Sequence, residues 1–466
     1  MPRIYIETFG CQMNEADSQY VADRASAAGY GIVARPEEAD VLVINTCTVR
    51  DNAERRAYGR MNHFKALKDA APTTRLVVMG CLAEQDRDRM RKLAPHVDAV
   101  FGTRELAQLG DQLAAWQPDF SDEMDFAGDR ALLMPFGGTP DAVADAFSPL
   151  RAFVNVQRGC SYYCTFCIVP HVRGRFDHRP QHTIVRDVEA KVAGGAREVM
   201  LVGQTVNAWK DAATGADFGK LCRAVGQIAG LERLSFISPH PKDFSEKIVA
   251  DLATVAQLNP RLHLPLQSAS DAVLRRMNRK YTAEQFHDKV QLVRRYLPEW
   301  AITTDIIVGF PGESEDDFER TLAYVRSGIF ANAYTFLYSI RRGTPAAHWE
   351  QVPRDVAAAR FARLVEAQNA STRAYHGAKV GTVARALIAG PSKKDARKLA
   401  AKTLDNVTLI APMPADYDEA SYAAQPWLDV SIEAAHLWGC TGSIVRRAAR
   451  YAERGSDVAQ PVVSLV

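Results

Sequence analysis

The sequence predicts a multidomain α/β protein in three parts: an N-terminal parallel α/β domain, a central partial barrel of β–α units and a small C-terminal β-barrel. Apolar strand-like stretches alternate with helical patterns near the N-terminus, and they do so again from Arg151 onward. From Lys379 the pattern changes to short strands broken by turns. At 466 residues the chain is also too long for one ordinary core.

Three cysteines of the first part share one local setting. Cys11, Cys47 and Cys81, here called the N-terminal triplet, follow the apolar stretches IYIETFG, VLVINT and LVVMG. Helical patterns over 15–28 and 52–69 separate them, which predicts right-handed βαβ units and a Rossmann-like parallel sheet. Ligands collect at the carboxyl ends of the strands in such sheets, so we expect the three cysteines to converge there.

Two interpretations of the N-terminal triplet are open. Buried cysteines often serve only as small apolar core residues. Three of them in equivalent positions favour a three-thiolate cluster site instead. Gly10 and Gly80 precede two of these cysteines and are expected to let the backbone turn sharply toward a bulky group. The other two cysteines, Cys222 and Cys440, lie in apolar settings and are expected to be structural.

The tightest cysteine group follows the first strand of the central part, in RGCSYYCTFCIVP. Its C-x3-C-x2-C spacing brings together Cys160, Cys164 and Cys167, here called the loop triplet. Three soft sulfur ligands suit an iron–sulfur cluster with one iron left open. An open iron can be chelated by the amino and carboxylate groups of S-adenosylmethionine (SAM), whose sulfonium bond is then cut by one electron. The spacing therefore indicates radical chemistry.

A closed zinc site made by the loop triplet with His171 is one alternative, and oxidised structural pairs are another. The opening MPRIYIETFG has no basic and apolar leader, so we expect a reducing, cytoplasmic location in which disulfides are rare. No apolar run reaches transmembrane length. The net charge of +2 gives no global argument for nucleic-acid binding, which must rest on local clusters.

Strand and helix patterns alternate through 150–376, which predicts a partial (β/α)6, TIM-like barrel with its active site at the carboxyl ends of the strands. The expected strands are 152–156, 198–202, 233–238, 261–264, 302–308 and 334–339. The expected helices include 184–193, 244–253, 283–296 and 315–327.

Polar and aromatic residues near these strand ends form a candidate set of SAM contacts. The set comprises Phe166, Gln204, Asn207, Ser238, Gln267 and Asp305. Such groups can hydrogen-bond ribose, adenine and amino-acid moieties, although each alone can also be a helix cap or a turn residue. For Phe166, shielding of the cluster is a simpler role than stacking on adenine.

Residues 119–149 are acidic and rich in glycine and proline, so they are expected to link domain 1–118 to the barrel. Residues 377–450 read as a small β-barrel, and 451–466 as a loosely ordered tail. An expected barrel loop carries a cationic run that suits contact with an RNA backbone: Lys393, Lys394, Arg397, Lys398 and Lys402. A solvated surface loop is the alternative.

These motifs resemble the radical-SAM methylthiotransferase family over nearly the whole chain. The match runs in order through ETFGCQMNEADS, VINTCTVRDNAERRAYG, VMGCLAEQ, VQRGCSYYCTFCIVPHVRG, LVGQTVN, LHLPLQSASD, DIIVGFPGE and GPSKKD. Within the family, CQMN and NTCTVRDNAE are most similar to the branch that modifies dimethylallyladenosine in tRNA. Two departures are visible: Ala269 stands where glycine is usual, and Arg342 where proline is usual.

The resemblance implies two 4Fe-4S clusters. The loop triplet would hold the one that binds and cleaves SAM, and the N-terminal triplet an auxiliary cluster that carries the sulfur. In this scheme one SAM methylates a sulfur of the auxiliary cluster, and a second yields a 5′-deoxyadenosyl radical that removes hydrogen from C2 of adenine. The carbon radical then takes the methylthio group. The implied target is N6-isopentenyladenosine at position 37 of tRNA, and the C-terminal barrel resembles a TRAM RNA-binding module.

The implied partners are the tRNA anticodon loop, a reductant protein such as flavodoxin or ferredoxin, and a protein that donates sulfur or an iron–sulfur cluster. No association with a membrane is expected. A cofactor radical suits the reaction, because an aromatic C–H bond gives acid–base catalysis little to act on. One alternative is a methylthiotransferase acting on threonylcarbamoyl-adenosine or on a ribosomal protein. The other is a non-catalytic iron–sulfur or zinc protein that binds RNA.

Overall fold

The computed structural model describes residues 1–48, 51–116 and 150–448. The chain divides into two compact units, each treated by itself. The N-terminal unit comprises residues 1–161, 167–177 and 202–204, and the C-terminal unit comprises 162–166, 178–201 and 205 onward. The expected linker 119–149 and tail 451–466 lie outside the described residues.

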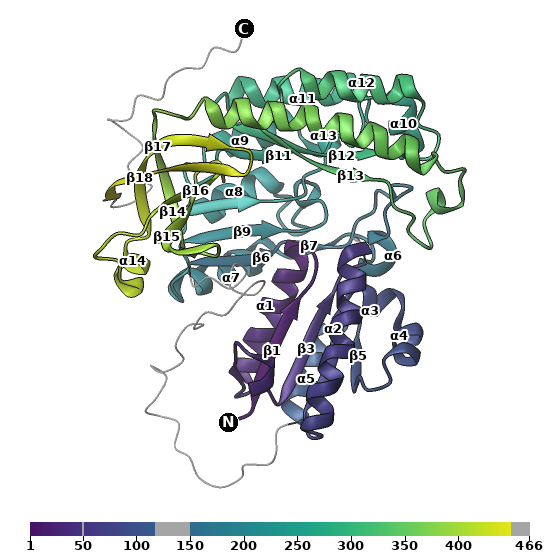
Figure 1. The fold of residues 1–466 in the computed structure, drawn as a ribbon, viewed down its shortest axis with the longest axis vertical. Helices are drawn as coiled ribbons and strands as arrows, with labels where there is room; N and C mark the ends of the chain where they lie inside the picture. The colour runs from purple at the N-terminus through teal and green to yellow at the C-terminus, as the bar shows by residue number, and fades with distance from the viewer. Residues whose placement is uncertain (49–50, 117–149, 449–466) are drawn as a thin grey trace. The chain divides into compact units, whose positions relative to one another are not determined.

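A parallel sheet with the strand order β2-β1-β3-β4-β5 forms the centre of the N-terminal unit (Figure 1). Its elements are β1 (Arg3–Thr8), α1 (Gln12–Ala27), β2 (Gly31–Ile32), β3 (Val41–Thr46), α2 (Asp51–Ala70), β4 (Arg75–Gly80), α3 (Cys81–Gln85), α4 (Arg87–Leu93), β5 (Ala99–Phe101) and α5 (Leu106–Ala115). The order is the flavodoxin-like form of the doubly wound sheet, whose switch point lies between β1 and β3. The predicted parallel α/β class is confirmed.

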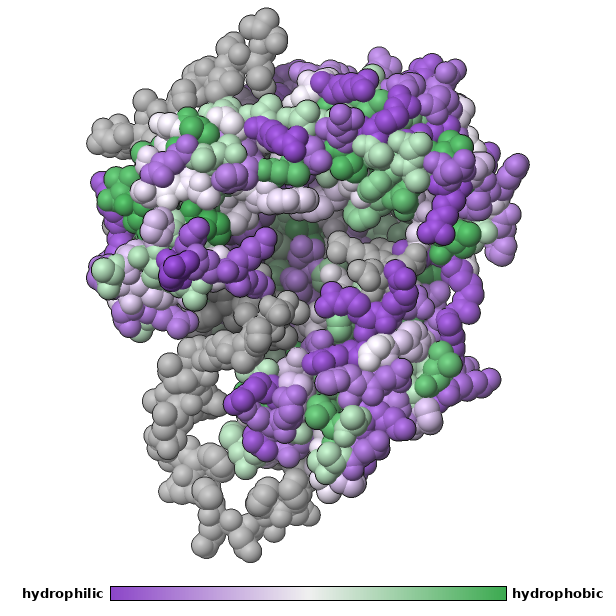
Figure 2. All heavy atoms as spheres, viewed as in Figure 1, coloured by the Kyte–Doolittle hydropathy of each residue, from purple (hydrophilic) through white to green (hydrophobic). Residues whose placement is uncertain are grey.

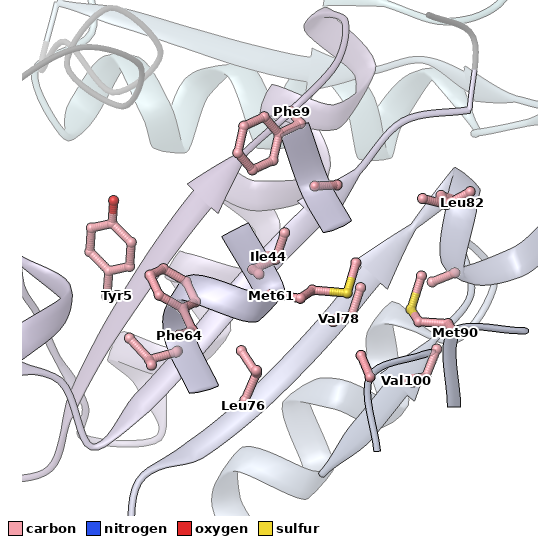
Figure 3. Close-up of a cluster of buried hydrophobic side chains, with 14 of the residues drawn as sticks. Tyr5, Phe9, Ile44, Met61, Phe64, Leu76, Val78, Leu82, Met90 and Val100 are labelled. Carbon is pink, nitrogen blue, oxygen red and sulfur yellow. The ribbon is translucent and has the colours of Figure 1, made fainter. Parts of the chain in front are cut away.

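The side chains of this sheet alternate between two apolar layers, because successive residues of a strand point to opposite faces. One layer packs against α1 and α5 and includes Ile4, Ile6, Val41, Val43, Val77 and Met79. The other packs against α2, α3 and α4 and includes Tyr5, Leu42, Ile44, Leu76 and Val78 (Figure 3). Helices on both faces leave the carboxyl edge of the sheet as the place for polar and reactive groups.

The N-terminal unit also contains β6 (Arg151–Asn155), β7 (Gln157–Arg158) and α6 (Val169–Arg173). The short helix α6 packs against α3, where Ile168 and Val172 form a small apolar cluster with Cys81. The Thr103 hydroxyl donates a hydrogen bond to the Val172 carbonyl over 2.5 Å. The segment that follows the loop triplet is therefore fixed beside a cysteine of the N-terminal triplet.

The β–α units of the C-terminal unit begin with α7 (Gln181–Ala193), β9 (Glu198–Val202), α8 (Phe218–Gly226), β10 (Arg233–Phe236) and α9 (Glu246–Ala253). They continue with β11 (Arg261–His263), α10 (Asp271–Arg276), α11 (Ala283–Tyr296), β12 (Ala301–Val308), α12 (Glu315–Arg326) and β13 (Asn332–Leu337), and α13 (Arg354–Gly377) follows. Every predicted barrel strand is present with its ends within two residues of the expected ones. Helices α11, α12 and α13 lie along one side of β11–β13 (Figure 1).

The central strands are parallel and form a partial barrel. β9 pairs with β10, and β11, β12 and β13 pair in that order. Between the two groups, the Leu234 N–H donates to the Gln257 carbonyl over 2.7 Å, and the Asn259 N–H donates to the Leu234 carbonyl over 2.8 Å. The predicted TIM-like class is confirmed.

The last strands close a barrel in the order β14-β15-β16-β18-β17. Their bounds are β14 (Val383–Ser392), β15 (Asp395–Thr403), β16 (Thr408–Pro412), β17 (Trp427–His436) and β18 (Gly439–Ala448), with the short helix α14 (Glu419–Ala424) before β17. This confirms the small C-terminal β-barrel. The barrel packs on the rest of its unit through Arg233, which donates to the Thr403 and Leu404 carbonyls over 3.2 Å each.

Hydrophilic side chains cover much of the visible surface, and the apolar residues there form small scattered groups (Figure 2). Among the described helices, none has both the length and the apolar composition needed to cross a bilayer.

Candidate active site

The three cysteines of the N-terminal triplet lie at one edge of the sheet. β1, β3 and β4 are neighbours, and the residues at their carboxyl ends pair in register. Cys11 caps the start of α1, Cys47 directly follows β3, and Cys81 opens α3. Cys11 and Cys47 flank the switch point between β1 and β3, where doubly wound sheets bind their ligands. The strand pattern thus predicted the shared position of these cysteines correctly.

Two glycines shape the backbone around these cysteines as the sequence predicts. Gly10 and Gly80 have φ angles of 145° and 103°, in the region that favours glycine. A Cβ atom on Gly80 would lie 2.5 Å from the Asn45 Oδ1 and from the Thr46 carbonyl oxygen. No side chain fits at residue 80, so the chain can enter α3 only through a glycine.

A network of buried side-chain amides holds the loops that carry the N-terminal triplet. The Asn14 Nδ2 donates to the Asn45 Oδ1 over 2.8 Å, and the Asn45 Nδ2 returns a bond of 2.8 Å to the Asn14 carbonyl. The Cys11 Sγ lies 3.5 Å from the Asn14 Oδ1. Buried amides that satisfy one another in this way fix the loops that carry the cysteines.

Arg173 is a buried cation beside the N-terminal triplet that sequence reasoning missed. Its Nε donates to the Cys81 Sγ over 3.2 Å, and its Nη2 lies 2.8 Å from the Asp17 Oδ2. The side chains of Arg173 and Asp17 are only 4% and 2% exposed. Burial raises the pKa of the Cys81 thiol to about 12, although Arg173 lowers it, and Cys47 and Cys11 raise it further. A thiolate ligand at this position needs the arginine charge, or a metal, to be stable.

The loop triplet is divided between the two units: Cys160 and Cys167 belong to the N-terminal unit and Cys164 to the C-terminal unit. In the N-terminal unit, Cys160 and Cys167 are half-buried, and the Cys160 N–H donates to the Gly174 carbonyl over 3.0 Å. His171 of the zinc alternative lies exposed on α6. In the C-terminal unit, Cys164 is 9% exposed.

Cys164 also lies beside a buried arginine. The Arg279 Nη1 donates to the Cys164 Sγ over 3.5 Å, and its Nε donates to the Tyr281 hydroxyl over 3.0 Å. The neighbouring Asn278 Nδ2 donates to the carbonyls of Tyr162 and Tyr163 over 3.2 and 3.0 Å. The turn that joins α10 to α11 therefore holds the middle of the cysteine loop by both its backbone and a sulfur.

All eight cysteines are thiols rather than disulfides. Within the described ranges, no group of three or more histidine, cysteine, aspartate or glutamate side chains stands ready to hold a metal ion. The donor sets nevertheless fit iron–sulfur chemistry. Each triplet offers three soft sulfur atoms, and a buried arginine donates a hydrogen bond to one sulfur of each.

Two predicted SAM contacts have strained backbones just after barrel strands. Ser238 follows β10 with a φ of 56°, and Gln267 follows β11 with a φ of 69°. For a residue other than glycine such a backbone costs about 1 kcal/mol or more, and it is typical of functional sites. The Gln267 Oε1 is buried and accepts no hydrogen bond from the described residues. Both residues stay candidates for contact with a ligand.

Other members of the predicted set are engaged by the protein itself. The Asn207 side chain is 3% exposed, accepts from the His240 N–H over 2.7 Å and donates to the His240 carbonyl over 2.9 Å. The Asp305 Oδ2 lies 3.2 Å from the His263 Nε2. Phe166 packs edge-to-face on Phe310 at 6.2 Å, within a small apolar cluster. These contacts favour a positioning role for Asn207 and a packing role for Phe166.

Gln204, the remaining member of the predicted set of SAM contacts, is half-buried in the N-terminal unit.

The two departures from the family pattern, Ala269 and Arg342, cause no backbone strain. Ala269 has an ordinary φ, and its N–H donates to the Thr321 Oγ1 over 3.0 Å, so alanine replaces glycine without strain. Arg342 is exposed.

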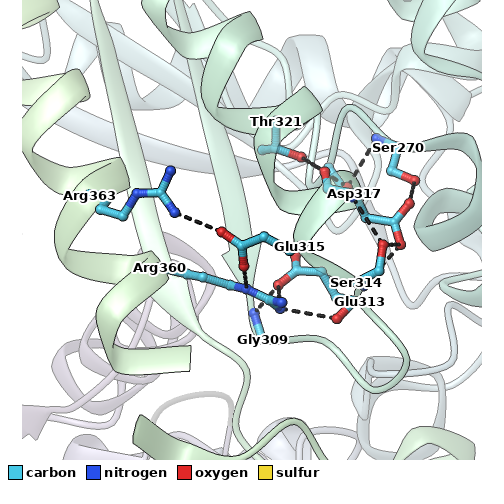
Figure 4. Close-up of polar contacts among 10 residues, drawn as sticks. Ser270, Gly309, Glu313, Ser314, Glu315, Asp317, Thr321, Arg360 and Arg363 are labelled. Atoms are coloured by element: carbon cyan, nitrogen blue, oxygen red, sulfur yellow. Dashed lines mark hydrogen bonds and ion pairs between the residues drawn. The ribbon is translucent and has the colours of Figure 1, made fainter. Parts of the chain in front are cut away.

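The loop after β12 is held by a buried ion pair. The Glu313 Oε2 accepts from the Gly309 N–H over 2.8 Å and from the Arg360 Nη1 over 3.1 Å (Figure 4). Burial raises the pKa of Glu313 to about 7, against the lowering by Gly309 and Arg360. Arg360 also bonds Glu315 over 2.8 Å, which ties the start of α12 to α13. Glu313 therefore fixes the shape of this loop rather than reaching into the space at the carboxyl ends of the barrel strands.

His240 lies at the centre of the aromatic residues near the cysteine loop. Its ring stacks on Tyr162 at 4.3 Å and meets Tyr281 edge-on at 5.6 Å. Burial lowers its pKa to about 2, and the cations Arg279 and Lys242 lower it further. The imidazole is therefore neutral at every physiological pH and cannot serve as a proton donor in its charged form.

This burial makes the stability of the protein depend on pH. The folded pKa lies below the unfolded value of about 6.5, so His240 favours folding above that pH and opposes it as the pH falls. His240→Phe is expected to remove about 2 kcal/mol of the loss in unfolding free energy between pH 7.5 and 5.0. Urea unfolding at both values measures this. The exposed His182→Gln is the matched control, and equal pH dependence in His240→Phe and wild type would contradict the prediction.

The cationic run lies on a hairpin and not on an irregular loop, which corrects the sequence-based expectation. Lys393 and Lys394 occupy the turn after β14, while Arg397, Lys398 and Lys402 lie on β15. Asp395 pairs with Arg397 at 3.0 Å and lies 4.0 Å from Lys398. The Lys402 Nζ donates to the Thr408 Oγ1 over 2.7 Å. Lys393, Lys394, Arg397 and Lys398 are exposed and Lys402 is half-buried, so the first four are the stronger candidates for RNA contact.

Two known families match this chain, one over its N-terminal α/β domain and one over its central partial barrel. Residues 3–102 match a family described as uncharacterized protein family UPF0004, and residues 154–325 match the radical SAM superfamily. Among solved structures, the chain resembles the radical S-adenosylmethionine methyltransferase TsrM from Kitasatospora setae, with tryptophan substrate and a SAM analog bound. That likeness has a TM-score of 0.53 at 13% identity and covers 74% of this chain and 75% of the other. It shows the fold alone.

Curated relatives match most of the chain. The tRNA-2-methylthio-N(6)-dimethylallyladenosine synthase of Acidothermus cellulolyticus is 45% identical over 416 residues, which cover 87% of this chain and 82% of the relative. The proteins of the same name from Thermobifida fusca and Desulfitobacterium hafniense are 42% and 38% identical, over 86% and 87% of this chain and 81% and 90% of their own length. The chain therefore belongs to the family of tRNA-2-methylthio-N(6)-dimethylallyladenosine synthases, within the radical SAM superfamily.

Proposed function

We propose that this protein is a tRNA methylthiotransferase that inserts a methylthio group at C2 of N6-isopentenyladenosine 37. The observation that carries the proposal is the family membership over most of the chain, together with two cysteine triplets placed at strand ends. SAM and one 4Fe-4S cluster follow from the radical SAM superfamily. Reductive cleavage of SAM supplies a radical that can activate an aromatic C–H bond.

The loop triplet, Cys160, Cys164 and Cys167, would hold the cluster that binds SAM. The N-terminal triplet would hold a second 4Fe-4S cluster, which carries the sulfur to be inserted. Two observations support the second site: three thiols at neighbouring strand ends, and the Arg173 charge beside Cys81. Hydrogen bonds to a ligating sulfur stabilise its thiolate form and tune the cluster.

The polar residues after the barrel strands position the substrates rather than exchange protons. Ser238 and Gln267 have strained backbones after β10 and β11, and the Gln267 Oε1 is a buried acceptor for a ribose hydroxyl or an amino group. His240 stays neutral and stacks on Tyr162 of the cysteine loop. A reductant protein such as flavodoxin or ferredoxin would supply electrons, and a separate donor would renew the sulfur.

Mass spectrometry of nucleosides from total tRNA tests the proposed function. A strain that lacks this protein is expected to accumulate N6-isopentenyladenosine and to lose its 2-methylthio derivative, and re-expression is expected to restore it. Loss of methylthiolated threonylcarbamoyl-adenosine instead would assign the protein to another substrate. An unchanged nucleoside profile, together with a colourless, zinc-loaded protein, would favour a non-catalytic RNA-binding role.

The C-terminal barrel, which resembles a TRAM module, would hold the tRNA through the hairpin of β14 and β15. Lys394→Glu with Lys398→Glu is expected to weaken tRNA binding and to lower the slope of log K against log salt by about 1.4 to 1.8. Affinity measured over a series of salt concentrations checks this. Lys65→Glu with Lys92→Glu, two exposed lysines of the N-terminal unit, carries the same charge change as a control. Unchanged affinity in the barrel variant would remove the hairpin from the interface.

A further inference from the structure

A small pocket lies beside the cysteine loop in the C-terminal unit. Its volume is about 250 Å³, and the residues that line it are Pro241, Lys242, Lys280, Tyr281, Gln285, Asp288 and Lys289. We call it the lysine pocket. Three ammonium groups against one carboxylate make it a cationic cavity, and its size suits one or two phosphate groups rather than a folded partner.

The charges of the lysine pocket are only partly offset by the protein: the Asp243 carboxylate interacts electrostatically with Lys242, and Asp288 lines the same cavity. Among the described residues, no carboxylate lies within ion-pair distance of the Lys242, Lys280 or Lys289 ammonium group. The Lys242 Nζ lies 5.3 Å from the centre of the Tyr162 ring, a cation–π contact that leaves its N–H groups available. Three clustered cations with fewer counter-charges repel one another, so an anion in the cavity stabilises them.

The backbone is strained at Lys280, which lines the pocket, and at Asn278 two residues before it. Asn278 and Lys280 have φ angles of 59° and 62°, a region that residues other than glycine rarely occupy. Such strain persists only where the surroundings enforce it, and it clusters at ligand-binding sites. Here the surroundings are the cysteine loop, because Asn278 bonds the Tyr162 and Tyr163 carbonyls.

Three consecutive residues join the pocket to the loop triplet. Asn278 holds the loop backbone, Arg279 donates to the Cys164 sulfur over 3.5 Å, and Lys280 lines the cavity. Tyr281, which also lines the cavity, donates its hydroxyl hydrogen to the carbonyls of Pro265 or Leu266. An anion bound in the pocket is therefore anchored within one residue of a side chain that contacts Cys164.

We propose that the lysine pocket binds backbone phosphate of the tRNA substrate and so fixes the anticodon loop beside Cys164. This rests on the proposed function, and it adds a second electrostatic anchor to the hairpin of the C-terminal barrel. A concave cavity with cationic walls suits the tetrahedral anions of a nucleic-acid backbone. Docking of an acidic reductant protein would instead require a broader, flatter patch, and it forms the competing outcome of the test.

The test compares two charge-reversed variants of the whole protein. Lys280→Glu with Lys289→Glu is expected to bind the tRNA about tenfold or more weakly and to lower the salt slope by about 1.4 to 1.8. Cleavage of SAM without tRNA, driven by dithionite, is expected to stay at the wild-type rate, which shows that the loop is intact. Arg186→Glu with Arg326→Glu, on exposed positions of α7 and α12 outside the pocket, is the matched control.

Each further outcome decides the proposal. Unchanged affinity and slope, or an equal loss in the control, would overturn it. A defect confined to turnover with a protein reductant would assign the pocket to electron delivery and overturn it as well. Inorganic pyrophosphate binding that the variant abolishes, with tRNA affinity unchanged, would assign it to a free anion. Failure of the wild type to methylthiolate bound tRNA would refute the proposed function but leave the pocket's role in binding measurable.

Discussion

Cys47→Ala is expected to cleave SAM with a chemical reductant at near the wild-type rate and to yield no methylthiolated nucleoside. Cys47 is 1% exposed and follows β3 in the N-terminal unit, so its loss removes one ligand of the proposed auxiliary cluster. Residues that only support a metal ligand cost 10- to 100-fold in activity when removed. Loss of a ligand itself is therefore expected to lower product formation by at least about 100-fold.

The measurements are 5′-deoxyadenosine release, methylthiolated product and iron per chain. Wild type is expected to hold about eight irons and Cys47→Ala about four, because one cubane is lost. Cys164→Ala is expected to lose SAM cleavage, since it removes a ligand of the other cluster. Cys222→Ala, a buried cysteine of α8 outside both triplets, is the matched control. Equal loss of SAM cleavage in Cys47→Ala and Cys164→Ala would contradict separate roles for the triplets.

Arg173→Met is expected to destabilise the N-terminal unit by about 3–5 kcal/mol, because it leaves the Asp17 carboxylate buried without its partner. Asp17 and Arg173 lie 2.8 Å apart at 2% and 4% exposure, so water cannot replace the lost ion pair. The same change removes the hydrogen bond to Cys81 and is expected to reduce occupancy of the auxiliary cluster. Thermal or urea unfolding measures the first effect, and iron content the second.

A double variant separates the two effects of Arg173. Arg173→Met combined with Asp17→Leu removes both buried charges, so its stability is expected to return close to that of wild type. Its iron content is expected to stay low, because the donor to Cys81 is still absent. Arg35→Met breaks an exposed ion pair with Glu38 and is expected to cost less than about 1 kcal/mol. A double variant as unstable as Arg173→Met would show that the ion pair is not the source of the effect.

Local patterns in the chain predicted the elements well because they depend on short stretches of sequence. The period of two in β1, β3 and β4 sets two apolar layers, and helix periods over α1 and α2 set the covering helices. The three cysteines of the N-terminal triplet follow from these strands, since parallel strands end at one edge. The hairpin of the cationic run was missed, because the turn at Lys393 and Lys394 has no glycine, proline or asparagine to mark it.

By itself, the sequence determined how the two cysteine triplets are grouped and predicted that they hold clusters: the loop triplet by its covalent spacing, and the N-terminal triplet by its place after equivalent strands. Only the tertiary structure decided which charges lie beside them. Arg173 lies 92 residues from Cys81 along the chain, and Arg279 lies 115 residues from Cys164. No local pattern marks such partners, because a charge is drawn to a buried sulfur by packing and desolvation that exist only in the folded chain.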